Sequence, residues 1–96
     1  MENSSTLHEK VQLLNPVRNE PSFIFQEVDL ERWELRKVEV YPNGSMEYAS
    51  EDKCSSRLRL SVEPLPTLVE IAQNPRFKPE SITAEEFERM WDLATR

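Results

Sequence analysis

The sequence predicts an α+β fold, in which an antiparallel β-sheet of about four to five strands is followed by two C-terminal helices packed on one face. Three observations predict this class. Short segments rich in aromatic and β-branched residues fill the first two thirds of the chain, one hairpin signal joins two of them, and both helix-start signals lie in the last third. Strands that precede helices, instead of alternating with them, favour antiparallel pairing.

Two strand candidates lie before residue 30. Residues 6–14 supply apolar side chains with imperfect alternation, within an N-terminal strand and loop at 1–20. Residues 22–28 (SFIFQEV) are rich in aromatic and β-branched side chains, which predicts a strand with Phe23 and Phe25 on the same face.

The longest strand candidate is residues 33–41 (WELRKVEVY), which follow a polar turn at 29–32. Its apolar positions change parity halfway along the segment. One extra residue in the strand would return both halves to the same face of the sheet. We therefore expect a β-bulge near Arg36 and Lys37.

The clearest turn signal is Pro42-Asn43-Gly44-Ser45. Asn-Gly favours positive φ at both residues, which is the type I′ geometry of tight hairpins. Residues 45–50 should then pair back onto the preceding strand.

The rest of the chain supplies a last strand and the helices. Residues 57–62 alternate strictly between polar and apolar side chains, which predicts the strand that completes the sheet region 21–63. In the helical region 67–95, Thr67 and Thr83 each precede a glutamate by three residues, the pattern of a capping box. The core expected between sheet and second helix consists of Val38, Val40, Leu58, Leu60, Phe87 and Trp91.

Composition indicates one small domain, 1–96, that we expect to be cytoplasmic. The chain has 18 acidic and 12 basic residues, a formal net charge of −6 and a pI near 4.8. A basic stripe for nucleic acid is missing, so we expect neither nucleic acid nor membrane as partner. The acidity is spread along the chain, and it fits either plain solubility or a surface that meets a basic partner.

The common catalytic motifs are missing from the sequence, and we expect no catalytic residues, no cofactor and no metal ion. The lone Cys54 and the lone His8 are far apart in the chain, and nothing in the sequence brings them together. Glu27, Asp29 and Glu31 alternate along a strand end, which is the minimum for a hard cation, but a solvated edge is the favoured interpretation. Abundant carboxylates leave a hydrolytic site as a further hypothesis.

A family resemblance is carried by residues 31–41 followed by Asn43-Gly44. This run resembles a small bacterial family of unknown function, whose members share an aromatic-Glu-x-Arg-Lys-Val-Glu strand leading into a hairpin glycine. Later pieces match too, at 65–71, 82–87 and 90–91, so the resemblance covers roughly 20–94. The N-terminal strand departs from the pattern, because residues 13–15 replace an expected Trp-x-His-like segment. Such domains resemble the stand-alone partners that bacteria encode beside secreted toxins.

The favoured functional hypothesis is an immunity-type inhibitor that covers the basic cleft of a toxin or nuclease. The alternatives are an adaptor or regulatory subunit of a housekeeping complex and, third, a carboxylate-based enzyme. Both tryptophans favour core positions, with an exposed aromatic anchor as the alternative. The expected partner-binding residues are acids beside aromatic side chains: Glu27, Asp29, Glu31, Trp33, Glu34, Tyr41, Glu51 and Asp52. The weaker candidate cluster is Glu85, Glu86, Glu88 and Asp92.

Overall fold

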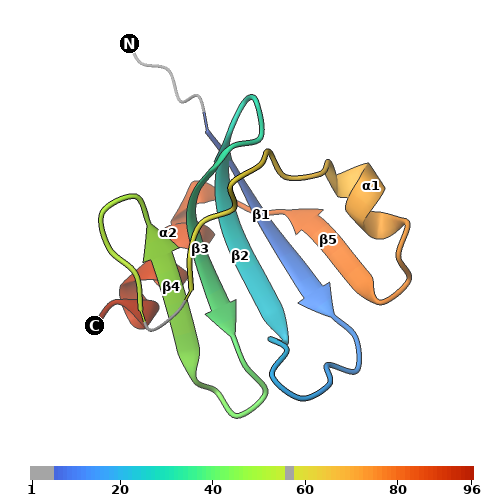
Figure 1. The fold of residues 1–96 in the computed structure, drawn as a ribbon, viewed down its shortest axis with the longest axis horizontal. Helices are drawn as coiled ribbons and strands as arrows, with labels where there is room; N and C mark the ends of the chain where they lie inside the picture. The colour runs from blue at the N-terminus through green and yellow to red at the C-terminus, as the bar shows by residue number, and fades with distance from the viewer. Residues whose placement is uncertain (1–5, 56–57) are drawn as a thin grey trace.

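The computed structural model describes residues 6–55 and 58–96 and confirms the α+β class. A five-stranded antiparallel sheet has the strand order β4-β3-β2-β1-β5 (Figure 1). The helix α2 packs across one face of the sheet, while the short α1 lies beside β5. The elements are β1 (Thr6–Leu13), β2 (Phe23–Asp29), β3 (Glu34–Val40), β4 (Met46–Ser50), α1 (Leu68–Ala72), β5 (Phe77–Ser81) and α2 (Ala84–Ala94).

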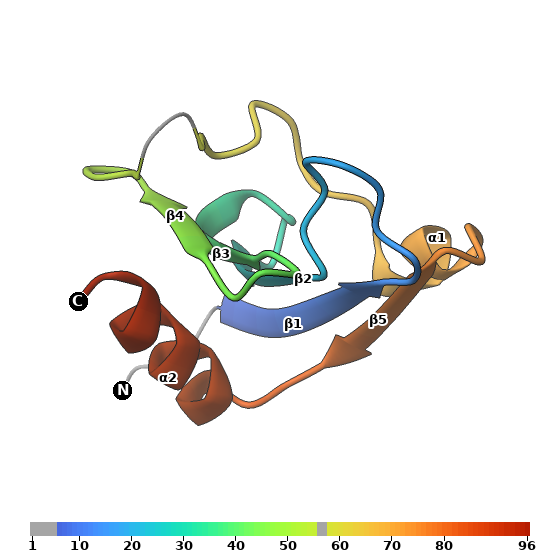
Figure 2. The same cartoon turned by 90° about the horizontal axis from the view of Figure 1, so that it is seen from below.

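The last strand predicted from the sequence is wrong. Residues 58–62 are not a strand, and Arg57 lies outside the described residues. The edge of β4 that they would need is already occupied, because Ser55 N–H donates to the Tyr48 carbonyl and Ser50 N–H to the Lys53 carbonyl. Residues 58–66, called the strap below, cross the face of the sheet opposite α2 (Figure 2). The fifth strand is instead β5, between the two helices.

The core lies between α2 and the sheet, as predicted. Phe25 and Val38 of the sheet are buried against Phe87 and Trp91 of α2, and Phe87 is fully buried. Each buried side chain of this size contributes about 1.5–3 kcal/mol of transfer free energy. Val40 is partly buried in the same cluster. The predicted membership of Leu58 and Leu60 is wrong, because the strap carries both to the other face.

A β-bulge does interrupt β3, slightly earlier than predicted. The register passes from Glu27 opposite Arg36 to Val28 opposite Glu34, so Leu35 is the extra residue. The bulge turns Glu34 toward the strap and leaves Trp33 outside the core, with 43% of its surface exposed. Trp91 is therefore the core tryptophan and Trp33 the displayed one.

The β3–β4 hairpin turn has a different type from the one predicted. Gly44 N–H donates to the Tyr41 carbonyl at 2.8 Å, and Gly44 has φ +89°. Asn43 is not among the residues with positive φ, which type I′ would require. A type I turn over Tyr41–Gly44 followed by a glycine bulge accounts for this, and it explains why Pro42 is accepted at the second turn position.

Both outer strands are protected by the chain itself. On β4 the segment 53–55 occupies the edge, as described above. On the β5 side, Leu14 N–H donates to Arg76 O and Ile82 N–H donates to His8 O, so the even-numbered residues of β5 direct their backbone groups toward β1. The backbone groups of the alternate residues face outward, and these are Phe77, Pro79 and Ser81. Pro79 has no N–H, and Phe77 N–H already donates to the Asn74 carbonyl. Among the described residues, no helix is long and apolar enough to cross a membrane.

Candidate functional site

The structure does not bring all eight predicted partner-binding residues together. Trp33 and Tyr41 stand just beyond opposite ends of β3, and at about 3.3 Å per residue they lie about 25 Å apart. The predicted set therefore divides into residues that are engaged inside the protein, residues displayed near Trp33, and Tyr41 in a separate groove.

The carboxylate of Glu27 is paired inside the protein, on the sheet face that α2 covers. Its Oε1 accepts from Arg36 Nε at 2.7 Å, and its Oε2 lies 2.8 Å from His8 Nε2. Because a carboxylate only accepts, that histidine nitrogen carries the hydrogen. Burial alone would raise the pKa of Glu27, but the hydrogen bonds from Arg36 and His8 outweigh it and hold the pKa below its ordinary value.

Arg36 joins this carboxylate to α2. Its guanidinium also donates to Glu88, and it lies 4.9 Å from the ring centre of Phe87 and 5.1 Å from that of Trp91. The hydrogen bond with Glu27, followed by the one with Glu88, raises the pKa of Arg36. Sequence reasoning missed His8 here, because nothing in the sequence links this residue to Glu27 or to Phe87. The group is a fully paired packing contact between sheet and helix.

Glu34 is engaged on the opposite face. Its side chain is 3% exposed, lies 3.3 Å from Lys37 Nζ, and accepts from Ser61 N–H at 2.7 Å. The backbone of the strap is thereby fixed to the bulged end of β3.

A second buried network holds the other end of the strap. Arg32 donates to both oxygens of Glu9, at 2.5 and 2.9 Å, and to the carbonyls of Leu65 and Pro66. Gln26 Nε2 donates to the same glutamate at 2.9 Å. Alternation along β1 places Glu9 on the face of two buried apolar residues, which is the one sequence signal that could have identified it.

The remaining predicted residues near Trp33 are displayed on the surface. Asp29 holds the β2–β3 turn, because its Oδ1 accepts from the N–H groups of Glu31 and Trp33, both at 2.9 Å. Glu31 is exposed beside Trp33. Two exposed apolar residues accompany them, Leu30 at 65% and Val62 of the strap at 87% exposure. Hydrogen bonds from Leu65 N–H to Arg32 O and from Ser61 N–H to Glu34 fix the strap on either side of Val62.

A hollow of about 540 Å³ continues this surface toward the β4 end of the sheet. Its lining includes two exposed acids of the 51–53 loop, together with Arg36 and the paired carboxylates of Glu27 and Glu34. We call the whole region the display surface. Its exposed residues are Leu30, Glu31, Trp33, Glu51, Asp52 and Val62. Leu35 and Leu60, which are half-buried and line the hollow, complete it.

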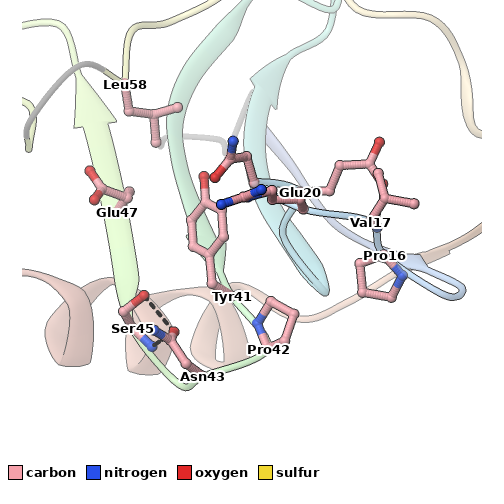
Figure 3. Close-up of a pocket in the computed structure, with 11 residues that line it drawn as sticks. Pro16, Val17, Glu20, Tyr41, Pro42, Asn43, Ser45, Glu47 and Leu58 are labelled. Carbon is pink, nitrogen blue, oxygen red and sulfur yellow. Dashed lines mark hydrogen bonds between the residues drawn. The ribbon is translucent and has the colours of Figure 1, made fainter.

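A larger groove of about 800 Å³ contains Tyr41 (Figure 3). It lies between the β1–β2 loop and the β3–β4 hairpin, with the ring of Tyr41 between Glu47 and the 16–20 loop. Tyr41 Oη donates to Glu39 Oε1 at 2.6 Å. Burial, then the hydrogen bond to Glu39 and the charges of Glu39 and Glu47, raises the pKa of Tyr41 well above its ordinary value.

The sequence also raised a metal ion and a cysteine–histidine pair as candidate chemistry. Among residues 6–55 and 58–96, no group of three or more His, Cys, Asp or Glu side chains could hold a metal ion. Cys54 Sγ accepts from Arg59 at 2.9 Å, whereas His8 packs between Glu27 and the Phe87 ring. The cysteine and the histidine thus belong to separate groups of contacts.

Comparison with known proteins gives one positive finding. Residues 8–96 match the model of a family described as Domain of unknown function (DUF6881). No curated protein and no solved structure matches the chain.

Proposed function

Because the chain belongs to the DUF6881 family, whose function is unknown, we propose its role from its surfaces: a non-catalytic domain that binds a positively charged protein through the display surface. In the form we favour, it is an immunity-type inhibitor that covers the basic cleft of a toxin or nuclease.

The observation that carries the proposal is the exposure of Trp33 next to Glu31, with two further exposed acids that follow β4 at the same end of the sheet. Glu27 and Glu34 are taken up by ion pairs inside the protein, but Glu31, Glu51 and Asp52 are exposed. Tryptophan is enriched among the residues that dominate binding energy at protein interfaces. The turn that presents it is fixed by Asp29 and by the strap, so little ordering is required on binding.

Charge then selects the partner. Exposed carboxylates at the end of the sheet that presents an aromatic anchor favour encounter with a basic surface and disfavour an acidic one. Such steering raises association rates by about tenfold or more at low ionic strength. An inhibitor benefits from fast encounter, because it must reach its target before the substrate does.

The test is a pull-down of candidate basic effectors, starting with the products of neighbouring genes, at about 0.05 M and about 0.5 M salt. Reversing Glu31, Glu51 and Asp52 to lysine should slow association by about tenfold at low salt and leave the melting temperature nearly unchanged. The matched control reverses Glu85 and Asp92 on α2, which should affect binding less. An association rate that is the same at both salt concentrations would exclude electrostatic capture.

A further inference from the structure

Two glutamates oppose each other on the sheet face that α2 leaves uncovered. Glu39 of β3 and Glu47 of β4 are direct partners in the antiparallel ladder. Side chains at such positions have Cβ atoms about 5 Å apart, and like charges placed there destabilise the pair. Both residues are half-buried, which limits the screening of their repulsion by water.

Among residues 6–55 and 58–96, the hydrogen bonds to these two carboxylates come from hydroxyl groups. Tyr41 Oη donates to Glu39 at 2.6 Å, and Ser55 Oγ donates to Glu47 at 2.8 Å. In the described part of the chain, neither carboxylate has a lysine or arginine within ion-pair distance. The other partly or fully buried glutamates in the described part of the chain differ, because each lies against a basic side chain: Glu9, Glu20, Glu27, Glu34 and Glu86.

The groove of about 800 Å³ borders this pair on the side of Glu47. Glu47 lines it, and Glu39 reaches it through Tyr41. Apolar walls are provided by Leu58 of the strap and Pro42 of the hairpin, on either side of the Tyr41 ring (Figure 3). A long side chain with an aliphatic stem and a cationic head matches this combination of walls and charge.

We propose that the groove receives an arginine side chain of a protein partner, with its guanidinium between Glu39 and Glu47. A guanidinium carries five N–H donors in a planar fork, enough to engage two carboxylates at once. The face of the Tyr41 ring offers a further cation contact. The pKa of Tyr41 is raised first by burial, and then by the hydrogen bond to Glu39 and by the negative charges of Glu39 and Glu47. The inference rests on the proposed function in one respect, that the arginine belongs to a protein.

Arg18 provides a variant whose expected effect on arginine binding is opposite to that of the glutamate variants. It is the basic residue lining the groove, and it is exposed on the 16–20 loop. Its positive charge repels the guanidinium of an incoming arginine. Removing it should therefore strengthen arginine binding, whereas neutralising Glu47 should weaken it.

The binding test uses acetyl-arginine amide as probe, followed by amide chemical shifts of the intact protein. Shifts should concentrate at Tyr41, Glu47 and Leu58, and acetyl-citrulline amide, neutral and of the same shape, should cause none of them. The variants Glu47→Gln and Glu39→Gln keep both hydroxyl hydrogen bonds and should each weaken binding at least about tenfold. Arg18→Ala should strengthen it. Shifts spread over the whole acidic surface, or unaltered affinity in both glutamine variants, would overturn the proposal.

Thermal stability gives a second, independent measurement. Because Glu47→Gln removes the repulsion from Glu39, it should raise the melting temperature of the free protein by about 2–4 °C while it lowers arginine binding. A lowered melting temperature would show that the pair is not repulsive and would count against the site. The two proposals can be rejected separately. If arginine binding is intact but the pull-down shows no salt dependence, the proposed function is rejected. If the pull-down depends on salt but acetyl-arginine amide does not bind, only the groove is rejected.

Discussion

Arg32 donates two hydrogen bonds to the carboxylate of Glu9, at 2.5 and 2.9 Å, on the face of the sheet that the strap covers. The arginine has φ +74°, a conformation that costs a side-chain-bearing residue free energy. The ion pair and the carbonyls of Leu65 and Pro66 hold it there. This contact ties the β2–β3 turn, the first strand and the strap together, and so sets the position of the neighbouring Trp33.

The first prediction concerns that ion pair. Arg32→Ala leaves the carboxylate of Glu9, a residue only 3% exposed, without its charged partner. The free energy of unfolding, measured by urea denaturation, should fall by about 3–5 kcal/mol. The double variant with Glu9→Ala should lose less than the sum of the two single changes, because it removes both charges. Additive losses would mean that the two groups do not act as a pair.

The second prediction compares the two tryptophans. Trp91→Ala should lower the free energy of unfolding by about 3–5 kcal/mol, a large part of the margin of a small domain, because it empties the centre of the α2 interface. Trp33→Ala should lower it by less than about 1 kcal/mol, because that ring is 43% exposed. Equal losses in the two variants would contradict the assignment of one tryptophan to the core and the other to the surface.

The third prediction is a loss of stability in acid that depends on Glu27. Its pKa is lower in the folded than in the unfolded protein, so its contribution to stability is complete above the unfolded value of about 4.3 and disappears as the pH falls through the folded value. Between pH 7 and pH 2, Glu27→Gln should therefore show a smaller decrease in melting temperature than the parent. The control Glu31→Gln changes an exposed glutamate and should keep the parent's decrease.

The fourth prediction tests the hairpin turn. Gly44→Val forces a β-branched residue to φ +89° and should lower the free energy of unfolding by about 1–3 kcal/mol. Asn43→Asp should be nearly neutral, because an aspartate can still accept from Ser45 N–H and Oγ as Asn43 does. If the glycine variant unfolds like the parent, the turn does not need positive φ at this position.

Sequence reasoning predicted the fold class well because local signals carried it. Alternation and β-branched content marked β2 and β3, and Thr67 and Thr83 cap the two helices as expected. It failed at β5, where Pro79 and polar neighbours give no strand pattern and pairing with β1 alone defines the strand. It also predicted a strand where the strap lies. The alternating residues of the strap do not pair with another strand: Ser61 bonds to Glu34, and Leu58 and Leu60 line the two hollows.

The site was only partly accessible to the same reasoning. Glu27 and Glu34 look like display residues in the sequence, because one partner of each, His8 and Ser61 respectively, is distant in the chain. Glu31, Glu51 and Asp52 are exposed on a turn and a loop, and their role in binding a partner stays a prediction. The opposed pair Glu39 and Glu47 was not, since it depends on the exact hairpin register.

The closed edges of the sheet have a consequence for how recognition evolves. With Pro79 on one side and the 53–55 segment on the other, a partner has little backbone to pair with, and recognition must rest on side chains. Strand addition reads the main chain and tolerates many sequences, whereas a side-chain surface changes its preference with single substitutions. Under the function proposed above, chains that share this backbone would acquire new partners through changes in the residues around Trp33, while the fold beneath them stays the same.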